Sequence, residues 1–230
     1  MKPADFKHIW EADKYDGKID TLIPFYDQIL ESLISLLPFS EEEDLKLIDL
    51  GCGTGTLALR LKNRYPKAQI TCLDIDEEMI KASKLKLKNY SNIKYIVSDF
   101  SNYIPDDNFD AVVSSLALHH IQEDLAKIEN YTKIYNSLVP DGIFLNADVV
   151  SAPSEWLEEI YVEKWVEYEL EYYTYEEVYE SILPQMYHPG ILKPLKPQLD
   201  MLQEIGLENV DVMWKYFHYA IFGGTKPSQG

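Results

Sequence analysis

The residues of this chain best suited to chemistry are acids and histidines that follow short apolar runs, together with a group of closely spaced glycines. Gly51, Gly53 and Gly55 come directly after the apolar residues 47–50. Glycine permits a turn in which backbone amides approach a ligand with no Cβ in the way. The next residues, 56–61, have helical character, so the turn would lead to a helix N-terminus that favours an anionic group. The stretch predicts a cradle for a nucleotide-like ligand.

The spacing of these glycines is not that of the dinucleotide-binding fingerprint. That fingerprint needs a third small residue five positions after its first glycine, where this chain has Thr56. With its acid at position 49, the run Leu-Ile-Asp-Leu-Gly-Cys-Gly-Thr-Gly resembles the first motif of the class I methyltransferases, which use S-adenosylmethionine. The resemblance implies that five residues contact this cofactor: Asp49, Gly51, Cys52, Gly53 and Gly55. A dehydrogenase and a plain tight turn remain as alternatives.

A second acid, Asp74, ends the predicted strand 69–74 and lies 19 residues after Gly55. A carboxylate in this place can accept hydrogen bonds from both hydroxyls of a ribose. Asp76 can cap the helix that follows. Residues 74–79 resemble the second motif of the same family, in which the acid holds the ribose while Ile75 and Met79 flank the adenine. The alternative is that Asp74 only caps the end of a strand.

Four further positions complete the predicted cofactor site. Asp99 and Phe100 lie at the end of the predicted strand 94–100, where family members bind the adenine amino group, although an Asp-Phe pair also opens ordinary turns. Ser115 ends a fourth strand at 109–116. Tyr15, in an N-terminal segment expected to fold over this edge of the sheet, could touch the carboxylate of the cofactor or the substrate.

His119 is the predicted base. S-adenosylmethionine already carries a good leaving group, so an enzyme has only to hold a nucleophile in line and, where necessary, remove its proton. Leu118-His119 resembles the segment that carries the base in a group of O-methyltransferases, and histidine titrates near neutrality. The alternative is that His119 packs against the cofactor or caps the next helix. Adjacent histidines on a helix point in different directions and no histidine follows at i+4, so no metal site is expected.

The order and spacing of the apolar runs predict the fold class. Helices are expected over 20–37 and 124–138, a turn at 140–142 and strands that alternate with helices up to residue 150, which indicates a doubly wound α/β sheet. The closely spaced strands 209–216 and 219–226 must then form an antiparallel pair. Five parallel strands and such a hairpin give a seven-stranded sheet like that of class I methyltransferases. We expect one domain over 1–230, with an N-terminal helical cap (1–40) and a helical lid insertion (152–196).

The predicted lid is acidic and aromatic. Residues 154–180 contain ten Glu and a single basic residue, Lys164, with several Tyr and Trp at helical spacing. Thr174 and Glu177 form a potential capping box. If the rings face the pocket, they favour a planar or cationic small molecule. If they face the sheet, they belong to the core.

The composition of the chain limits the classes of molecule that it is expected to bind. A formal net charge of −18 opposes binding to nucleic acid and to anionic lipid. Two cysteines cannot build a disulfide framework and no signal or membrane segment is apparent, so a cytoplasmic protein is expected. The main hypothesis is methyl transfer from S-adenosylmethionine to a small molecule, by a protein that could also form a homodimer.

Two other functions stay open. The closing strands, residues 213–226, loosely resemble the end of enzymes that modify the wobble uridine of tRNA, and one helix face carries Lys81, Lys84 and Lys88. Phosphate could use that face. A protein that binds S-adenosylmethionine without turning it over is the third hypothesis.

Overall fold

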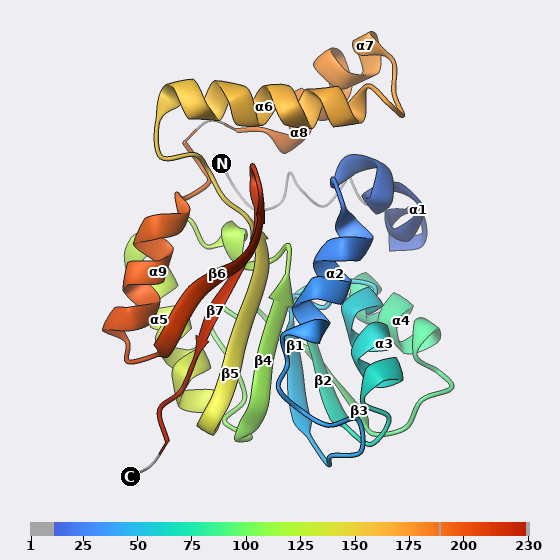
Figure 1. Cartoon of the computed structure of the whole chain (residues 1–230). Helices are drawn as coiled ribbons and strands as arrows, with labels where there is room; N and C mark the ends of the chain where they lie inside the picture. The colour runs from blue at the N-terminus through green and yellow to red at the C-terminus, as the bar shows by residue number, and fades with distance from the viewer. Residues whose placement is uncertain (1–11, 189, 229–230) are drawn as a thin grey trace.

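The computed structural model describes residues 12–188 and 190–228, with side chains from residue 16. Its centre is a seven-stranded sheet in the order β3-β2-β1-β4-β5-β7-β6 (Figure 1). The first five strands are parallel, and β7 pairs antiparallel with both β5 and β6, which confirms the predicted fold. The strands are β1 (Lys46–Leu50), β2 (Gln69–Asp74), β3 (Ile93–Val97), β4 (Phe109–Ser115), β5 (Leu138–Val149), β6 (Glu208–Tyr216) and β7 (Tyr219–Thr225).

Helices cover both faces of the sheet. One face packs against α2 (Tyr26–Ser35), α3 (Thr56–Arg64) and α4 (Glu77–Lys86), and the other against α5 (Asp124–Ser137) and α9 (Leu195–Glu204) (Figure 1). Alternate residues of each central strand therefore enter two separate apolar cores. In β5, for example, Leu145 belongs to the first core and Phe144 to the second. This arrangement leaves the carboxyl ends of the strands as the edge at which ligands bind in open α/β sheets.

The predicted helix 20–37 is wrong in its bounds, since the segment forms α1 (Ala12–Leu22) and α2 with a break between them. Pro24 lies at the break, and a proline disfavours helical geometry in the residue before it. Phe25 then adopts a left-handed conformation with φ of 59°. The apolar face predicted for this segment is buried on α2, where Leu30 and Leu33 are fully enclosed.

The predicted turn at 140–142 lies inside β5 instead of before it. Leu138 pairs with Phe109, but the next pair is Ile143 with Ala111, so the chain makes an irregular detour between them. Asp141 takes a left-handed conformation, with φ of 62°. An extra loop of this kind in a paired strand is a bulge-like irregularity, and the turn residues there distort the strand without ending it.

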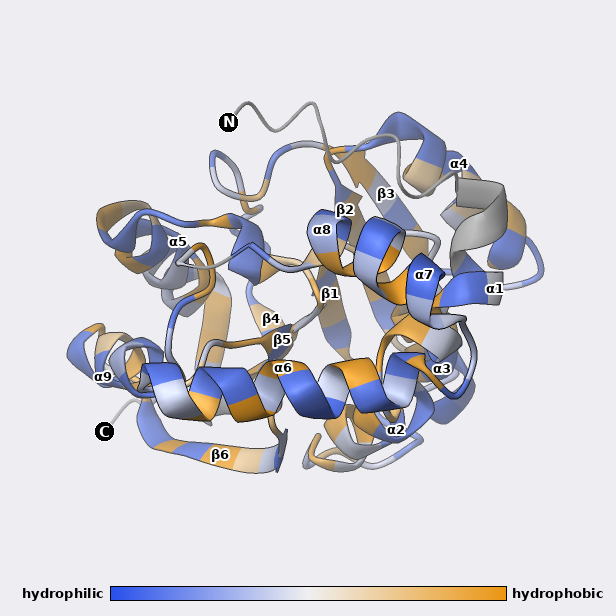
Figure 2. Cartoon of the chain, turned by 90° about the horizontal axis from the view of Figure 1, so that it is seen from above, coloured by the Kyte–Doolittle hydropathy of each residue, from blue (hydrophilic) through white to orange (hydrophobic). Residues whose placement is uncertain are grey.

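The insertion after β5 lies above the carboxyl edge of the sheet. It contains α6 (Glu155–Glu169), α7 (Tyr175–Glu177), the π-helical turn η3 (Val178–Ile182) and α8 (Leu183–Met186). Figure 2, seen from above, shows α6 crossing this edge of the molecule. The capping box of Thr174 and Glu177 is present, as predicted. None of the described helices is long and apolar enough to cross a membrane.

Hydrogen bonds hold α6 to the N-terminal helices. The indole Nε1 of Trp165 donates to the carbonyl of Leu22 over 3.0 Å, and the Tyr168 hydroxyl donates to the carbonyl of Asp20. At the other end of the helix, Glu158 contacts His218 over 3.1 Å. Of the two predicted roles for the lid aromatics, Trp165 takes the core role because it is buried.

Candidate functional site

The three glycines of the bend after β1 serve different purposes. All have positive φ, between 52° and 83°, which glycine adopts without strain. A Cβ at Gly51 would lie 2.3 Å from the Cβ of Ala117, and one at Gly55 would lie 2.5 Å from the Oγ of Ser83. A Cβ at Gly53 would meet nothing within 4 Å. Packing therefore requires the first and third glycines, whereas Gly53 borders open space that a ligand could enter.

Four amides of the bend are bonded within the fold. The backbone N–H groups of Gly51 and Cys52 both donate to the carbonyl of Leu73, over 2.8 and 3.0 Å, and that of Gly55 donates to the carbonyl of Cys52 over 2.9 Å. The Gly53 N–H donates to the carboxylate of Asp74. The Cys52 thiol is buried as well. The prediction that the amides of this bend face a ligand is therefore wrong for these four residues, because the bend uses their N–H groups to hold its own shape.

Asp74 connects the bend to the end of β2. One of its carboxylate oxygens accepts from the Gly53 N–H and the other from the Asp76 N–H, each over 2.8 Å. Asp76 in turn caps α4 through the N–H of Glu78, as predicted. Burial raises the pKa of Asp74, although these two amides oppose the shift. Ile75, beside it, is 60% exposed and lies on the rim of the edge.

Asp49 is a buried acid at the end of β1 with an unused oxygen. Its side chain is almost fully enclosed, and Oδ2 has no hydrogen-bond partner among the described residues. Burial, and then repulsion from Asp74, raises the pKa of Asp49 to about 7. The Ser115 Oγ, at the end of the neighbouring β4, is also buried without a partner in the described part. Because buried polar atoms are rarely left unpaired, both fit a site that a ligand completes.

The adenine positions are brought together only in part. Phe100 is buried with its ring 3.4 Å from the Cβ position of Gly51, so it packs against the bend. The side chain of Asp99 accepts from the backbone N–H of Ser101 and from the side-chain amide of Asn102, over 2.8 and 3.0 Å. These bonds form an ordinary turn, which was the alternative to an adenine contact. Met79 is half-buried on α4.

The N-terminal helix reaches the bend through a residue that the sequence analysis missed. Asp16 accepts from the Thr54 hydroxyl over 2.6 Å and pairs with the Lys86 ammonium over 2.7 Å. These contacts link α1, the bend and α4. Tyr15 lies beside it in α1, but its side chain is outside the described part of the structure. No sequence pattern indicates a pairing between residues so far apart, so the place of Asp16 beside the bend could not be predicted.

His119 is held by an acid from the neighbouring strand. It lies in the short 3₁₀ turn η2 (Leu118–His120), and its Nδ1 is 2.6 Å from Oδ1 of Asp148. The carboxylate of Asp148 also accepts from the Val149 N–H and the Asn146 amide, over 2.9 and 3.1 Å. Burial alone would raise the pKa of Asp148, but His119 and the Lys127 ammonium lower it below its ordinary value.

This contact determines what the imidazole can do. A carboxylate bound to Nδ1 fixes the tautomer that carries its proton there, which leaves Nε2 as an acceptor. His119 is about one fifth exposed, whereas Asp148 is buried. The order of the parallel strands places both residues at the same edge of the sheet, but their pairing depends on the geometry of η2. Within residues 12–188 and 190–228, no three His, Cys, Asp or Glu side chains are grouped to hold a metal ion.

Comparison with known proteins extends these observations. A family profile described as a methyltransferase domain matches residues 47–142. The chain is 27% identical to the carboxy-S-adenosyl-L-methionine synthase of Nautilia profundicola over 92% of this chain and 90% of the relative. It is 31% identical to a malonyl-[acyl-carrier protein] O-methyltransferase of Ilyobacter polytropus, over 45% of this chain and 39% of the relative.

Solved structures have the same fold. A phosphoethanolamine N-methyltransferase of Haemonchus contortus aligns with a TM-score of 0.68 at 15% identity, over 99% of this chain and 61% of that one. A protein of Methanococcus maripaludis aligns with a TM-score of 0.63 at 18% identity, over 95% and 93%. The matched profile begins at β1 and includes the glycine bend, Asp74, Asp99 and His119. Sheet order, bend and relatives agree: residues 47–142 match a methyltransferase domain, and the fold is the one that S-adenosylmethionine-dependent methyltransferases share.

Proposed function

We propose that this enzyme methylates a small molecule at an atom that loses a proton, with His119 as the general base and Asp148 as its positioning residue. S-adenosylmethionine supplies a methyl group on a sulfonium leaving group. The protein has then to place the acceptor in line and to remove its proton. The contact of 2.6 Å between His119 and Asp148 is the observation that carries the proposal.

The cofactor would be held by the acids at the edge of the sheet. Asp49 has an enclosed, unpaired oxygen and suits the ammonium group of the cofactor. Asp74 has one amide on each oxygen, and because a carboxylate has about four acceptor sites, it can still accept from both ribose hydroxyls. Gly53 leaves room for the amino-acid part. We assign Ile75, Met79, Asp99 and Phe100 to the adenine, and Ser115 and Tyr15 to the rim of the site.

The proton would pass from the acceptor to Nε2 of His119. The imidazolium that forms is stabilised by Asp148, whose carboxylate is buried and stays ionised through its contacts with His119 and Val149 and through the charge of Lys127. A carboxylate in this place also prevents rotation of the ring. Histidine paired in this way is typical of general bases.

A second candidate comes from the relatives. Several proteins that match more than nine tenths of this chain are named carboxy-S-adenosyl-L-methionine synthases. In the product that gives them this name, the cofactor itself has gained a carboxyl group. A carboxylated donor would favour a guanidinium in its site. The chain has two arginines, Arg60 and Arg64, and both pair with acids at the surface of the N-terminal half. The acidic lid also opposes an anionic donor, so methyl transfer is favoured.

The tRNA hypothesis has little support from the predicted basic face. Lys81 pairs with Glu78 over 2.8 Å, and the Lys84 ammonium lies 5.5 Å from the ring centre of Tyr95. Of the three lysines, only Lys81 forms an ion pair with a described residue, so the formal net charge of −18 is the main argument against binding to phosphate. Salt-sensitive retardation of tRNA in a gel would reverse this preference.

Labelled cofactor and a metabolite extract test the proposal. Wild-type protein should transfer isotopic methyl to a small molecule, and His119→Ala and Asp148→Asn should each lower the rate by about a hundredfold or more. Binding of S-adenosylhomocysteine should stay within about threefold of wild type, because neither residue belongs to the predicted cofactor cradle.

His120→Ala is the matched control, since it removes the adjacent imidazole, whose ring centre is 4.1 Å away, and should leave the rate near wild type. Equal rates for all four proteins would reject a base at position 119. A carboxylated cofactor in the mass spectrum, without labelled acceptor, would favour the second candidate. Tight cofactor binding with no product of either kind would leave only a binding protein.

A further inference from the structure

A cavity of about 550 Å³ lies between the start of α2, the lid helix α6 and the end of β6. No residue of the glycine bend lines it, and neither His119 nor Asp148 does. It is therefore separate from the site described above. Five of the side chains that line it are aromatic: Phe25, Tyr26, Tyr168, Tyr172 and Tyr216.

The rings come from three parts of the chain that are distant in sequence. Phe25 and Tyr216 meet edge to face, with ring centres 4.8 Å apart. Tyr168 and Tyr172, at the end of the lid helix, have ring centres 5.2 Å apart. Phe25 is 40% exposed and Tyr172 is 51% exposed, so ring surface remains accessible at this cavity. Exposed aromatic faces in one cavity form the surroundings that attract organic cations.

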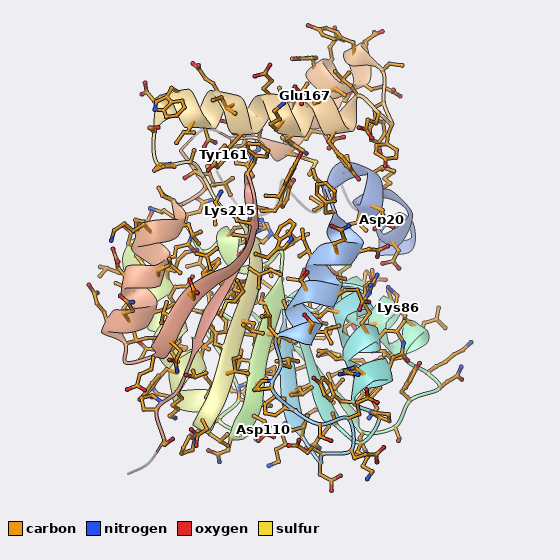
Figure 3. The ribbon with its side chains drawn as sticks, viewed as in Figure 1. Asp20, Lys86, Asp110, Tyr161, Glu167 and Lys215 are labelled. Atoms are coloured by element: carbon orange, nitrogen blue, oxygen red, sulfur yellow. The ribbon has the colours of Figure 1, made fainter. Side chains whose placement is uncertain are left out.

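The charged residues around the cavity also favour a cation. Asp20, Asp27, Glu167 and Glu171 line it, with Lys164 as the single cation in the lining. Figure 3 shows Glu167 on α6 above Asp20 at the end of α1. Arg60 pairs with Asp27, and Lys164 pairs with Glu167.

The other two acids leave an excess of negative charge. Asp20 and Glu171 make no ion pair with any residue that the structure describes. Burial first, and then repulsion from Asp27, raises the pKa of Asp20, while the charge of Arg60 opposes the shift. No three of these acids are grouped in the described part of the chain to hold a metal ion. Rings and acids together therefore suit a larger, weakly hydrated cation.

We propose that this cavity binds an organic cation, a quaternary or protonated amine, against the rings of Phe25, Tyr172 and Tyr216 and beside the carboxylates of Asp20 and Glu171. The site is additional to the cofactor cradle, and its existence does not depend on the proposed methyl transfer. A ligand there would contact α2, α6 and β6 at once and so would hold the lid helix to the body of the enzyme.

Calorimetry with choline as the probe tests this site in the full chain. Choline should bind, and 3,3-dimethylbutan-1-ol, which has the same shape without the charge, should bind at least tenfold more weakly. Tyr172→Leu and Glu171→Gln should each weaken choline binding by about three- to tenfold. Both side chains are at the surface, so both variants should keep the thermal stability of the wild type.

Glu159→Gln is the matched control, since it removes the same charge from an exposed position of α6 outside the cavity and should leave choline binding unchanged. Binding of S-adenosylhomocysteine is measured on every protein. Intact binding of that compound with no heat from millimolar choline would overturn the cation site alone. Equal affinity for choline and its uncharged analogue would overturn it too, as would unchanged affinity in both cavity variants.

Discussion

Replacing Asp49 by asparagine should stabilise the empty protein and weaken its hold on the cofactor. The carboxylate is almost fully enclosed, one oxygen has no partner in the described structure, and Asp74 repels it. An ionised group in such a place lowers the stability of the folded protein, because unfolding returns it to water. The same buried charge suits an ammonium group, so its removal should weaken cofactor binding while it raises the stability of the empty protein.

The size of the effect follows from the pKa of Asp49, which rises from 3.8 to about 7 on folding. A shift of this extent corresponds to a ceiling of about 4 kcal/mol. Since the folded pKa is the higher one, the penalty is absent below about pH 4, grows as the pH rises and is complete above about pH 7. We expect Asp49→Asn to gain about 2 kcal/mol at pH 8, or about 4 to 8 °C in melting temperature.

Thermal melts at pH 5 and pH 8, with and without S-adenosylhomocysteine, measure both effects. At pH 5 the gain should fall to less than half of its value at pH 8, because Asp49 is then protonated in the folded wild type but already ionised in the unfolded chain. Affinity for S-adenosylhomocysteine at pH 8 should fall by about ten- to a hundredfold. Asp106→Asn, at an exposed position, is the control and should change neither quantity. A gain of equal size at both pH values, or a variant less stable than wild type at pH 8, would refute the electrostatic reasoning.

Three other substitutions test separate parts of the site. Gly53→Val should weaken binding of S-adenosylhomocysteine more than tenfold in calorimetry and should lower the melting temperature through the strain of a β-branched residue at φ of 52°. Gly51→Val should lower the melting temperature by far more, because its Cβ also meets that of Ala117. Asp74→Ala should weaken binding by about 1 to 3 kcal/mol, and unchanged affinity would exclude it from the ribose site. Glu169→Gln should stabilise the protein in urea at pH 9 more than at pH 7, since burial raises the pKa of Glu169 to about 8 and ionisation above that value destabilises the lid.

The sheet could be predicted from the sequence because each strand is a short apolar run bounded by turn residues. The central strands β1, β2 and β4 were placed to within a residue or two, since burial on both faces makes them continuously apolar. The break before α2 was missed, because it depends on the left-handed backbone of Phe25 and the apolar period continues through that residue. The turn at 140–142 was predicted, but the sequence does not show that the strand begins before it and continues after it.

Only the part of the site that follows from the strand order could be predicted from the sequence. Parallel strands bring Asp49, Asp74 and Asp148 to one edge, and this follows from strand order alone. The pairing of Asp148 with His119 does not follow, because it depends on the 3₁₀ turn after β4 and on the amides that hold the carboxylate. Contacts over 2.6 Å between residues 29 positions apart leave no periodic signal in a single sequence.

In the glycine bend, a glycine can be required by internal packing or by a ligand, and the sequence alone does not distinguish these two requirements. Gly51 and Gly55 have no room for a Cβ, so the packing of Ala117 and Ser83 would select glycine there even in a protein with no ligand. Gly53 has room, and its φ of 52° is open to a few other residue types. Packing therefore gives no reason for glycine at position 53, whose amide is bound to Asp74, and its positive φ is the reason that the fold itself supplies. In the proposed site a bound cofactor adds a second reason, because it would fill the space in which a side chain at position 53 would lie.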